Sequence, residues 1–284
     1  MNLREACRTG TERLRAAGIA DAVVDARLLL EWAAGISVTE YALNPEKPLT
    51  DEQEEAYWSG VEKRCRRIPL QHITGEQEFM GLTFHVNPSV LIPRQDTELL
   101  VEEALKRIRP GMRVLDLCTG SGCIAISLER FARREKDFKE TNKFTGSDIS
   151  PEAVATAREN GRLHGAQVTF VESDLFEGLE GKYDMIVSNP PYIRTAVIEE
   201  LEEEVRCHDP VLALDGKEDG LYFYRRIIRE AGEYLNDGGW LLFETGHDQK
   251  DAVIYLMKQA GYREICAYKD LAGLDRAVAG RYYV

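Results

Sequence analysis

The 284-residue sequence is short of basic charge: 36 Lys and Arg stand against 49 Asp and Glu, and the net charge is −13. A protein that grips duplex nucleic acid needs a basic surface to neutralise the phosphates. This deficit argues against direct nucleic-acid binding. It favours a small molecule or another protein as the partner.

Long apolar runs are also absent. No stretch of about 18 apolar residues occurs, so the sequence predicts no membrane-spanning helix. The first ten residues, MNLREACRTG, lack the apolar core of a signal peptide. We therefore expect a cytoplasmic protein with no membrane partner, and we expect it to be a monomer.

Cysteine and histidine are few and scattered. The six cysteines include no C-x-x-C pair, and the five histidines do not cluster. These spacings argue against a disulfide framework and against the usual zinc motifs. We expect reduced thiols and no metal site.

Residues 1–70 carry apolar residues at helical spacing and predict a small helical domain. Thr50 and Gln53 form a capping-box sequence that starts one of its helices, and Pro69 closes the segment. Without a glycine-rich loop or clustered catalytic residue types, this domain is expected to dock or position a substrate.

Residues 71–97 predict a β-hairpin linker. The expected strands are 79–86 and 90–92, with Asn87-Pro88 as the turn. Thr97 or Asp96 is the expected cap of the helix that follows.

Residues 98–284 alternate strand and helix patterns, which predicts βαβ units, a mostly parallel sheet and an α/β fold. Two segments near the end are expected to form a closing antiparallel pair, residues 263–268 and 281–284. The five strands predicted before them lie at residues 113–117, 144–148, 168–171, 183–187 and 239–244.

Two stretches of the sequence are highly charged. We interpret residues 130–143 as a solvated helix end and loop. Residues 199–204 contain five glutamates and predict an exposed helical face, with a role in meeting a basic partner as the alternative.

A glycine-rich loop joins the first of these strands to its helix. Gly120 and Gly122 permit a tight turn and a close backbone approach to a ligand above a helix N-terminus. With Ala125 they also fit the G-x-G-x-x-A form of a dinucleotide fingerprint. Such loops serve several nucleotide cofactors.

Acidic residues follow the next two strands. Asp148 can accept hydrogen bonds from both ribose hydroxyls of a nucleoside. Asp174 can accept from an adenine amino group while Leu175 packs on the ring. Each acid alone is more often a cap or turn residue. Together with Asp116 and the glycine loop, they predict a nucleoside site.

The sequence Asn189-Pro190-Pro191-Tyr192 ends the strand predicted at 183–187. The prolines lack N–H donors and fix φ near −65°, so the ladder must stop there. The four residues form a platform with an amide, several backbone carbonyls and an aromatic ring, at the sheet edge where α/β folds bind ligands. The simpler alternative is a proline-rich turn that only ends the strand.

These motifs resemble a known family. Asp116-x-x-x-Gly120-x-Gly122, with Asp148 and Asp174, resembles class I S-adenosylmethionine-dependent methyltransferases, and the platform resembles their amino-methylating members. Further segments make the chain similar to the HemK/PrmC family, the peptide chain release factor glutamine N5-methyltransferases, from about Pro69 to the end. These segments lie at residues 90–94, 97–98, 213–216, 219–221 and 270–273.

The resemblance implies a Rossmann-like methyltransferase sheet that takes S-adenosylmethionine and releases S-adenosylhomocysteine. It implies that the acceptor is the glutamine of the Gly-Gly-Gln motif in class 1 release factors. The substrate contacts would be Asn189, Pro190, Pro191 and Tyr192. The cofactor contacts would be Asp116, Cys118, Thr119, Gly120, Ser121, Gly122, Asp148, Asp174, Leu175 and Asn189.

The chain departs from the family at a few positions. It has Gln95-Asp96 where the family usually has Pro-Glu, and Cys118 where the family commonly has glycine. Residues 208–210 also differ from the usual form. None of these changes removes a group that the chemistry needs. Arg94 could contact a cofactor carboxylate or form a structural ion pair.

The predicted catalytic residues are Asn189, Pro190 and Tyr192. A glutamine amide nitrogen is a poor nucleophile because its lone pair is delocalised into the carbonyl. Asn189 Oδ1 and the Pro190 carbonyl would accept its two N–H groups and orient it, while Tyr192 stacks on the amide plane.

Several other functions remain open. A glutamine methyltransferase of ribosomal proteins or an adenine-N6 methyltransferase of nucleic acid would use the same chemistry. A dinucleotide-dependent oxidoreductase would explain the glycine loop but not the platform. A non-catalytic nucleoside-binding module would not need Asn189.

Overall fold

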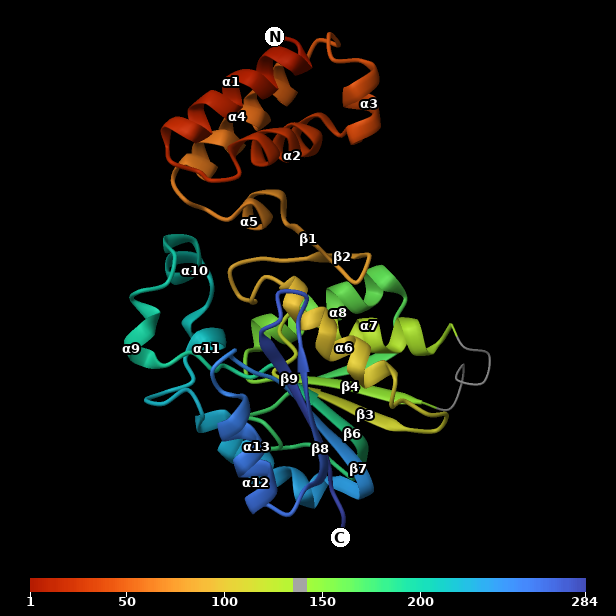
Figure 1. The fold of residues 1–284 in the computed structure, drawn as a ribbon. Helices are drawn as coiled ribbons and strands as arrows, with labels where there is room; N and C mark the ends of the chain where they lie inside the picture. The colour runs from red at the N-terminus through yellow and green to blue at the C-terminus, as the bar shows by residue number, and fades with distance from the viewer. Residues whose placement is uncertain (135–141) are drawn as a thin grey trace. The chain divides into compact units, whose positions relative to one another are not determined.

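The computed structural model describes residues 1–134 and 142–284 (Figure 1). The chain divides into two compact units. The first contains residues 1–76 and 202–208, and the second contains residues 77–201 and 209–284. The solvated loop expected at 130–143 falls largely on residues 135–141, which lie outside the described residues. Within the described part of the chain, no helix has the length and apolar character needed to cross a membrane.

The first unit is helical. Its helices are α1 (Leu3–Ala16), α2 (Ala22–Ala34), α3 (Val38–Leu43), α4 (Asp51–Cys65), α5 (Leu70–Thr74) and α10 (Glu203–His208). Helices α1, α2 and α4 pack around a core that includes Leu14, Leu29 and Tyr57. The capping box at the start of α4 is confirmed: Gln53 N donates to Thr50 Oγ1 at 3.2 Å, and Thr50 N donates to Gln53 Oε1 at 3.0 Å.

Helix α10 belongs to this first unit although it comes late in the sequence. Arg64, 6% exposed, donates to Asp25 Oδ2 at 2.7 Å and to Glu204 Oε1 at 2.8 Å. Residues 199–204 were expected to form one exposed helical face: four of the five glutamates are exposed, but the stretch does not form one helix, and Glu204 is only partly exposed. Helix α9 (Thr195–Ile198) ends before this stretch, α10 begins at Glu203, and Glu204 pairs with a buried guanidinium.

A two-stranded hairpin is present, but it lies earlier in the sequence than expected. Its strands are β1 (Glu76–Phe79) and β2 (Leu82–His85), and the turn is Met80-Gly81. Both turn residues have positive φ, 53° and 69°, as tight hairpins require. Asn87-Pro88 lies after β2, and residues 90–92 form no strand. Thr97 ends a short 3-10 helix, η1 (Gln95–Thr97), and makes no cap hydrogen bond to α6 (Glu98–Leu105).

The second unit is built on a seven-stranded sheet in the order β5-β4-β3-β6-β7-β9-β8. The pairs from β5 to β7 are parallel, and β9 runs antiparallel to both neighbours. The α/β fold with a mostly parallel sheet and an antiparallel closing strand is confirmed. The strands are β3 (Arg113–Leu117), β4 (Lys143–Asp148), β5 (Val168–Glu172), β6 (Tyr183–Ser188), β7 (Leu235–Glu244), β8 (Arg263–Lys269) and β9 (Asp275–Arg281).

The last strand lies earlier than the expected 281–284. Gly273, with φ 81°, lies in the turn after β8, and β9 begins two residues later. Its small side chains Ala277, Val278 and Ala279 are all buried. Tyr282 and Tyr283, which follow, have a composition that favours a strand. The strand instead forms from the small, buried residues before them.

Helices cover both faces of this sheet (Figure 1). Helices α6, α7 (Cys123–Ala132) and α8 (Pro151–His164) cover one face, and α12 (Tyr222–Tyr234) and α13 (Lys250–Gln259) cover the other. Successive strand residues face opposite sides. Val114 and Val187 therefore join the first core, and Leu115 and Ile186 join the second. A sheet that is buried on both faces leaves its strand ends as the place for a ligand site.

Candidate active site

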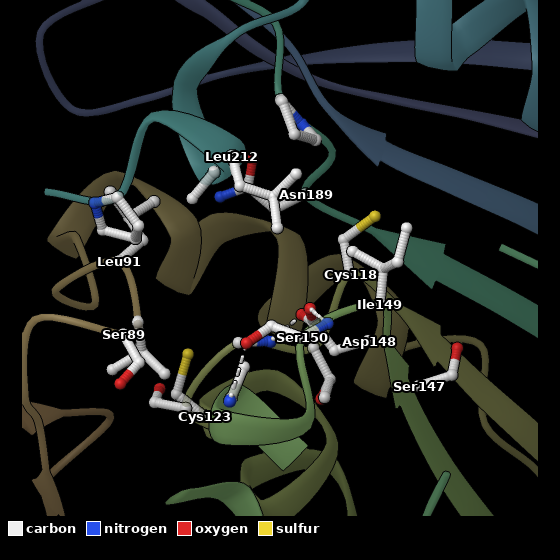
Figure 2. A pocket seen from close by; sticks show the side chains of 18 of the residues that line it. Ser89, Leu91, Cys118, Cys123, Ser147, Asp148, Ile149, Ser150, Asn189 and Leu212 are labelled. Atoms are coloured by element: carbon white, nitrogen blue, oxygen red, sulfur yellow. Dashed lines mark hydrogen bonds between the residues drawn. The ribbon is translucent and has the colours of Figure 1, made fainter. Parts of the chain in front are cut away.

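A cavity of about 480 Å³ opens at the carboxyl ends of β3, β4, β5 and β6 (Figure 2). The strand order reverses between β3 and β6, so this is the switch point where open α/β sheets bind ligands. The lining combines loop residues after these strands with residues from segments 88–97 and 210–213. The predicted site residues that line it are Cys118, Thr119, Gly120, Ser121, Asp148, Asp174, Leu175, Asn189 and Pro191.

Asp116 does not line the cavity but lies beneath the glycine loop, 1% exposed. Its Oδ2 accepts hydrogen bonds from Thr119 Oγ1 at 2.6 Å and from Ala125 N at 3.2 Å. Burial raises the pKa of this carboxyl to about 7, against the lowering effect of those two hydrogen bonds. From its position in β3, Asp116 therefore stabilises the glycine loop through these two hydrogen bonds.

The glycine loop has a left-handed backbone at several positions. Cys118, Gly120 and Gly122 have φ of 60°, 54° and 82°. A side chain is strained in this region, so the glycine that the family commonly has at position 118 would be more relaxed there than Cys118. Gly122 is not among the lining residues and is the N-cap residue that precedes α7; a Cβ added to it would lie 3.1 Å from side-chain atoms of Ala157 and Phe170.

Asp148 ends β4 and faces the cavity (Figure 2). Its Oδ2 accepts from Gly120 N at 2.9 Å, and its Oδ1 accepts from Ser150 N at 3.0 Å. Burial raises the pKa of Asp148, and hydrogen bonds from Ser150, Gly120 and Ile149 oppose that rise. Each carboxylate oxygen keeps lone pairs for a further donor, so the side chain can both fix the loop and accept from a ligand. Ser150 caps α8 by accepting from Ala153 N.

Asp174 and Leu175 follow β5 on another wall of the cavity. Asp174 Oδ1 pairs with Arg226 Nη1 at 3.1 Å, a partner on α12 that the sequence pattern did not indicate. Leu175 has φ of 50°, a conformation that is rare for a leucine and common at functional sites. Its side chain is buried, which suits an apolar wall against a flat ring.

Asn189 reaches the cavity from the end of β6, and Pro191 lines it as well. Pro190 and Tyr192 are not among the lining residues. The backbone at the end of the platform is held by two hydrogen bonds. The Tyr192 carbonyl accepts from Gln249 Nε2 at 2.9 Å, and the carbonyl of the next residue, Ile193, accepts from Gly216 N at 2.8 Å. The platform is therefore held by Gln249, which precedes α13, and by the loop around Gly216.

Two polar residues that sequence reasoning did not assign to the site contact the platform: Thr97, which also lines the cavity, and Glu244, which does not. Asn189 Nδ2 donates to Thr97 Oγ1 at 3.4 Å, and Tyr192 Oη donates to Glu244 Oε1 at 3.2 Å. Glu244 ends β7 and is 2% exposed. An acidic residue at the carboxyl end of a parallel strand was a signal that could have found it.

Arg94 lines the cavity and also forms an ion pair. Its Nη2 lies 2.5 Å from Oδ2 of Asp209, whose side chain is almost completely buried. A guanidinium has five N–H donors, so this pair leaves others for a ligand. The structural ion pair is thus present, and a contact with a cofactor carboxylate stays a prediction.

Comparison with known proteins adds to this geometry. Residues 5–75 match the PrmC N-terminal domain, and residues 93–205 match the methyltransferase small domain. A release factor glutamine methyltransferase of Geobacter sulfurreducens is 45% identical over 265 residues, covering 93% of this chain and 91% of the relative. One of Agrobacterium fabrum is 38% identical over 278 residues, with 95% and 94% covered.

The chain belongs to the release factor glutamine methyltransferase family. It is an enzyme of the S-adenosylmethionine-dependent methyltransferase type. The resemblance drawn from its motifs is confirmed, and the oxidoreductase and the non-catalytic module are set aside. A crystal structure of a methyltransferase from Pyrococcus furiosus shares the fold, with a TM-score of 0.53 at 20% identity over 78% of this chain and 100% of that one.

Proposed function

We propose that this protein transfers a methyl group from S-adenosylmethionine to the side-chain amide nitrogen of the glutamine in the Gly-Gly-Gln motif of class 1 release factors. One observation carries the proposal. Asn189, whose amide suits another amide, borders the same cavity as Asp148, whose carboxylate suits ribose hydroxyls. The names of the relatives support the release factor as the substrate.

The cavity residues fit S-adenosylmethionine. The volume of about 480 Å³ lies in the usual range for a small-molecule site. Asp148 would accept from the ribose hydroxyls and Asp174 from the adenine amine, with Leu175 and Ile149 as apolar walls. The backbone of residues 118–121 would approach the ligand closely, and Arg94 would bind its carboxylate with donors not used by Asp209. When bound, S-adenosylmethionine supplies an electrophilic methyl group on its sulfonium.

The role of Asn189 follows from the chemistry of the acceptor. A glutamine side-chain nitrogen is planar, and its lone pair is shared with the carbonyl. Asn189 Oδ1 and the Pro190 carbonyl would accept its two N–H bonds, orient it and favour the pyramidal geometry of a nitrogen that forms a new bond. This is catalysis by position and placed dipoles. The extra proton would leave to solvent afterwards. Stacking of Tyr192 on the amide plane stays a prediction, because its hydroxyl is held by Glu244.

The remaining proposals concern the roles of the domains, the class of substrate, the oligomeric state and the location of the enzyme. The helical unit, expected at residues 1–70, would dock the release factor, with the hairpin region 71–97 as linker and residues 98–284 as the catalytic part. The net charge of −13 supports a protein substrate over a nucleic acid. We further propose a monomeric, cytoplasmic enzyme.

The test is incubation of a purified class 1 release factor with this protein and S-adenosylmethionine, followed by mass spectrometry of its tryptic peptides. The expected result is one added methyl group on the glutamine of the Gly-Gly-Gln peptide. A release factor with that glutamine replaced by alanine is the control and should gain none.

Parallel incubations separate the alternatives. Methylation of a ribosomal-protein glutamine without methylation of the release factor would keep the chemistry and replace the substrate. Methylation of an adenine-containing oligonucleotide alone would contradict a protein substrate altogether.

A further inference from the structure

The platform of residues 189–192 cannot be fixed by strand pairing along its whole length, because its two prolines have no backbone N–H to donate. Its position therefore depends on contacts with other segments of the second unit. One of these contacts comes from a side chain: Gln249 Nε2 donates to the Tyr192 carbonyl at 2.9 Å. The proposed mechanism does not yet give this glutamine a function.

Gln249 lies in the turn after β7 and is 7% exposed. It occupies the N-cap position of α13, but its side chain makes no cap hydrogen bond to that helix. The side chain instead bonds to backbone groups of three other residues. Oε1 accepts from Gly246 N at 3.1 Å, and Nε2 donates to the carbonyls of Tyr192 at 2.9 Å and Gly220 at 3.3 Å. One buried amide thus joins the turn after β7, the platform after β6 and the loop before α12.

These partners fix the orientation of the Gln249 amide. The Gly246 N–H needs an acceptor and the two carbonyls need donors, so Oε1 and Nε2 cannot exchange places. The surrounding backbone is also close. A Cβ added to Gly246 would lie 2.9 Å from Gln249 Oε1, and one added to Gly220 would lie 2.6 Å from Nε2. The side chain therefore has little room for another orientation.

We propose that Gln249 is a positioning residue that fixes the platform for methyl transfer. The inference rests on the proposed function, because Asn189 Oδ1 and the Pro190 carbonyl are the groups that would accept the glutamine N–H bonds. Both residues lie within three positions of Tyr192, and the prolines fix φ near −65°, so an anchor at the Tyr192 carbonyl leaves them little freedom. Gln249 does not line the cavity, so it acts only through the platform.

The first test is methyl transfer to the release factor by Gln249→Met, with the enzyme saturated with both substrates. Methionine keeps the length of the glutamine side chain but removes its N–H donors. Because a displaced platform misaligns the acceptor nitrogen, we expect kcat to fall by about 10- to 100-fold.

Gln249→Glu separates the missing donor from general damage to the fold. Its carboxylate keeps an acceptor for Gly246 N but places a second oxygen against two carbonyl oxygens. When ionised, it should lower kcat as Gln249→Met does; when protonated, its O–H can again donate to the Tyr192 carbonyl. Burial raises the pKa of such a carboxyl. The kcat of Gln249→Glu relative to the wild type should therefore rise by about fivefold or more as the pH falls from about 8.5 to about 5.5.

Charged and titratable groups on the surrounding segments are also present in the wild type, so their titration cancels in this ratio. They are the exposed His247, the ion pairs Asp248–Arg194, Asp219–Arg225, Lys250–Asp275 and Arg276–Asp270, and the Tyr192 hydroxyl with its acceptor Glu244. Asp248→Asn is the matched control, because it alters the preceding residue, whose exposed ion pair contributes little. It should keep kcat within about threefold of the wild type at each pH.

Two results would overturn the inference and leave the proposed function intact. One is a Gln249→Met enzyme with the wild-type kcat. The other is a Gln249→Glu enzyme whose kcat stays at the same fraction of the wild-type value at every pH, because the loss would then come from damage to the fold and not from the missing donor. Failure of the wild type to methylate the glutamine would instead refute the proposed function and the inference with it.

Discussion

Replacement of Asp148 by asparagine probes the proposed cofactor site most sharply. Both oxygens of this carboxylate already accept from backbone N–H groups, Oδ2 from Gly120 at 2.9 Å and Oδ1 from Ser150 at 3.0 Å. In Asp148→Asn one of these oxygens becomes an NH₂ group. That group must face a backbone N–H, so one loop hydrogen bond is lost. The ribose hydroxyls also lose their charged acceptor.

The magnitude follows from these hydrogen bonds. A bond to a charged group contributes about 1.5–3 kcal/mol and a neutral one about 1 kcal/mol. Conversion of the ribose contacts from charged to neutral, with the strain on the loop, should cost about 2 to 3 kcal/mol of binding free energy. This corresponds to a dissociation constant for S-adenosylmethionine that is roughly 30- to 150-fold higher.

Isothermal titration with S-adenosylmethionine measures this change directly. Asp184→Asn is the matched control: Asp184 accepts from Arg113 N and from Asn236 Nδ2, both at 2.7 Å, but it is the second residue of β6 and lies at the amino ends of the parallel strands, away from the cavity. The control should bind within about threefold of the wild type. An Asp148→Asn protein with wild-type affinity would refute the assignment of Asp148 to the ribose.

Two further predictions concern the platform and the loop. In Gly216→Ala the new Cβ would lie 2.7 Å from the backbone Cα and C of Tyr192, so we expect kcat to fall by about tenfold or more and stability by about 1–3 kcal/mol. The control is Gly165→Ala, whose Cβ meets nothing within 4 Å; its φ of 58° strains an alanine, so it should lose stability but keep kcat. Wild-type kcat in Gly216→Ala would contradict the role of the loop. Asp116 has its pKa raised from 3.8 to about 7, so its contribution to stability is complete below pH 3.8 and is lost as the pH rises to about 7. Urea unfolding should therefore show Asp116→Asn gaining on the wild type by roughly 4 kcal/mol between pH 4 and pH 8; a difference that does not change with pH would contradict the raised pKa.

Much of the fold could be predicted because parallel strands that are buried on both faces have a strong apolar pattern. The strands at 113–117 and 183–187 were placed to within a residue or so of β3 and β6. The hairpin was misplaced for a physical reason. Met80-Gly81 forms the turn through positive φ at both residues, whereas Asn87-Pro88 has the stronger turn composition.

The cavity could be anticipated only in part. Asp148, Asp174 and Asn189 follow strands in sequence, and a parallel sheet gathers such residues at one edge. The groups behind them come from distant segments. Thr97 was interpreted as a helix cap, but its hydroxyl instead accepts a hydrogen bond from Asn189, which lies 92 positions later in the sequence. Local spacing cannot reveal a partner of this kind.

The packing of α10 with the first unit also had no sequence signal. The glutamates of 199–204 have the composition of a solvated surface, and only tertiary structure brings Glu204 to Arg64. A buried guanidinium with two carboxylate partners is visible only once the chain is folded.

The most direct measurement of the central claim is single-turnover methyl transfer to a release factor by the wild type and by Asn189→Ala, each saturated with S-adenosylmethionine. Removal of a placed acceptor should lower the rate of methyl transfer by about 10²- to 10³-fold. Asn236→Ala, at the opposite edge of the sheet, should be unaffected. A rate within a few-fold of the wild type in Asn189→Ala would contradict the account.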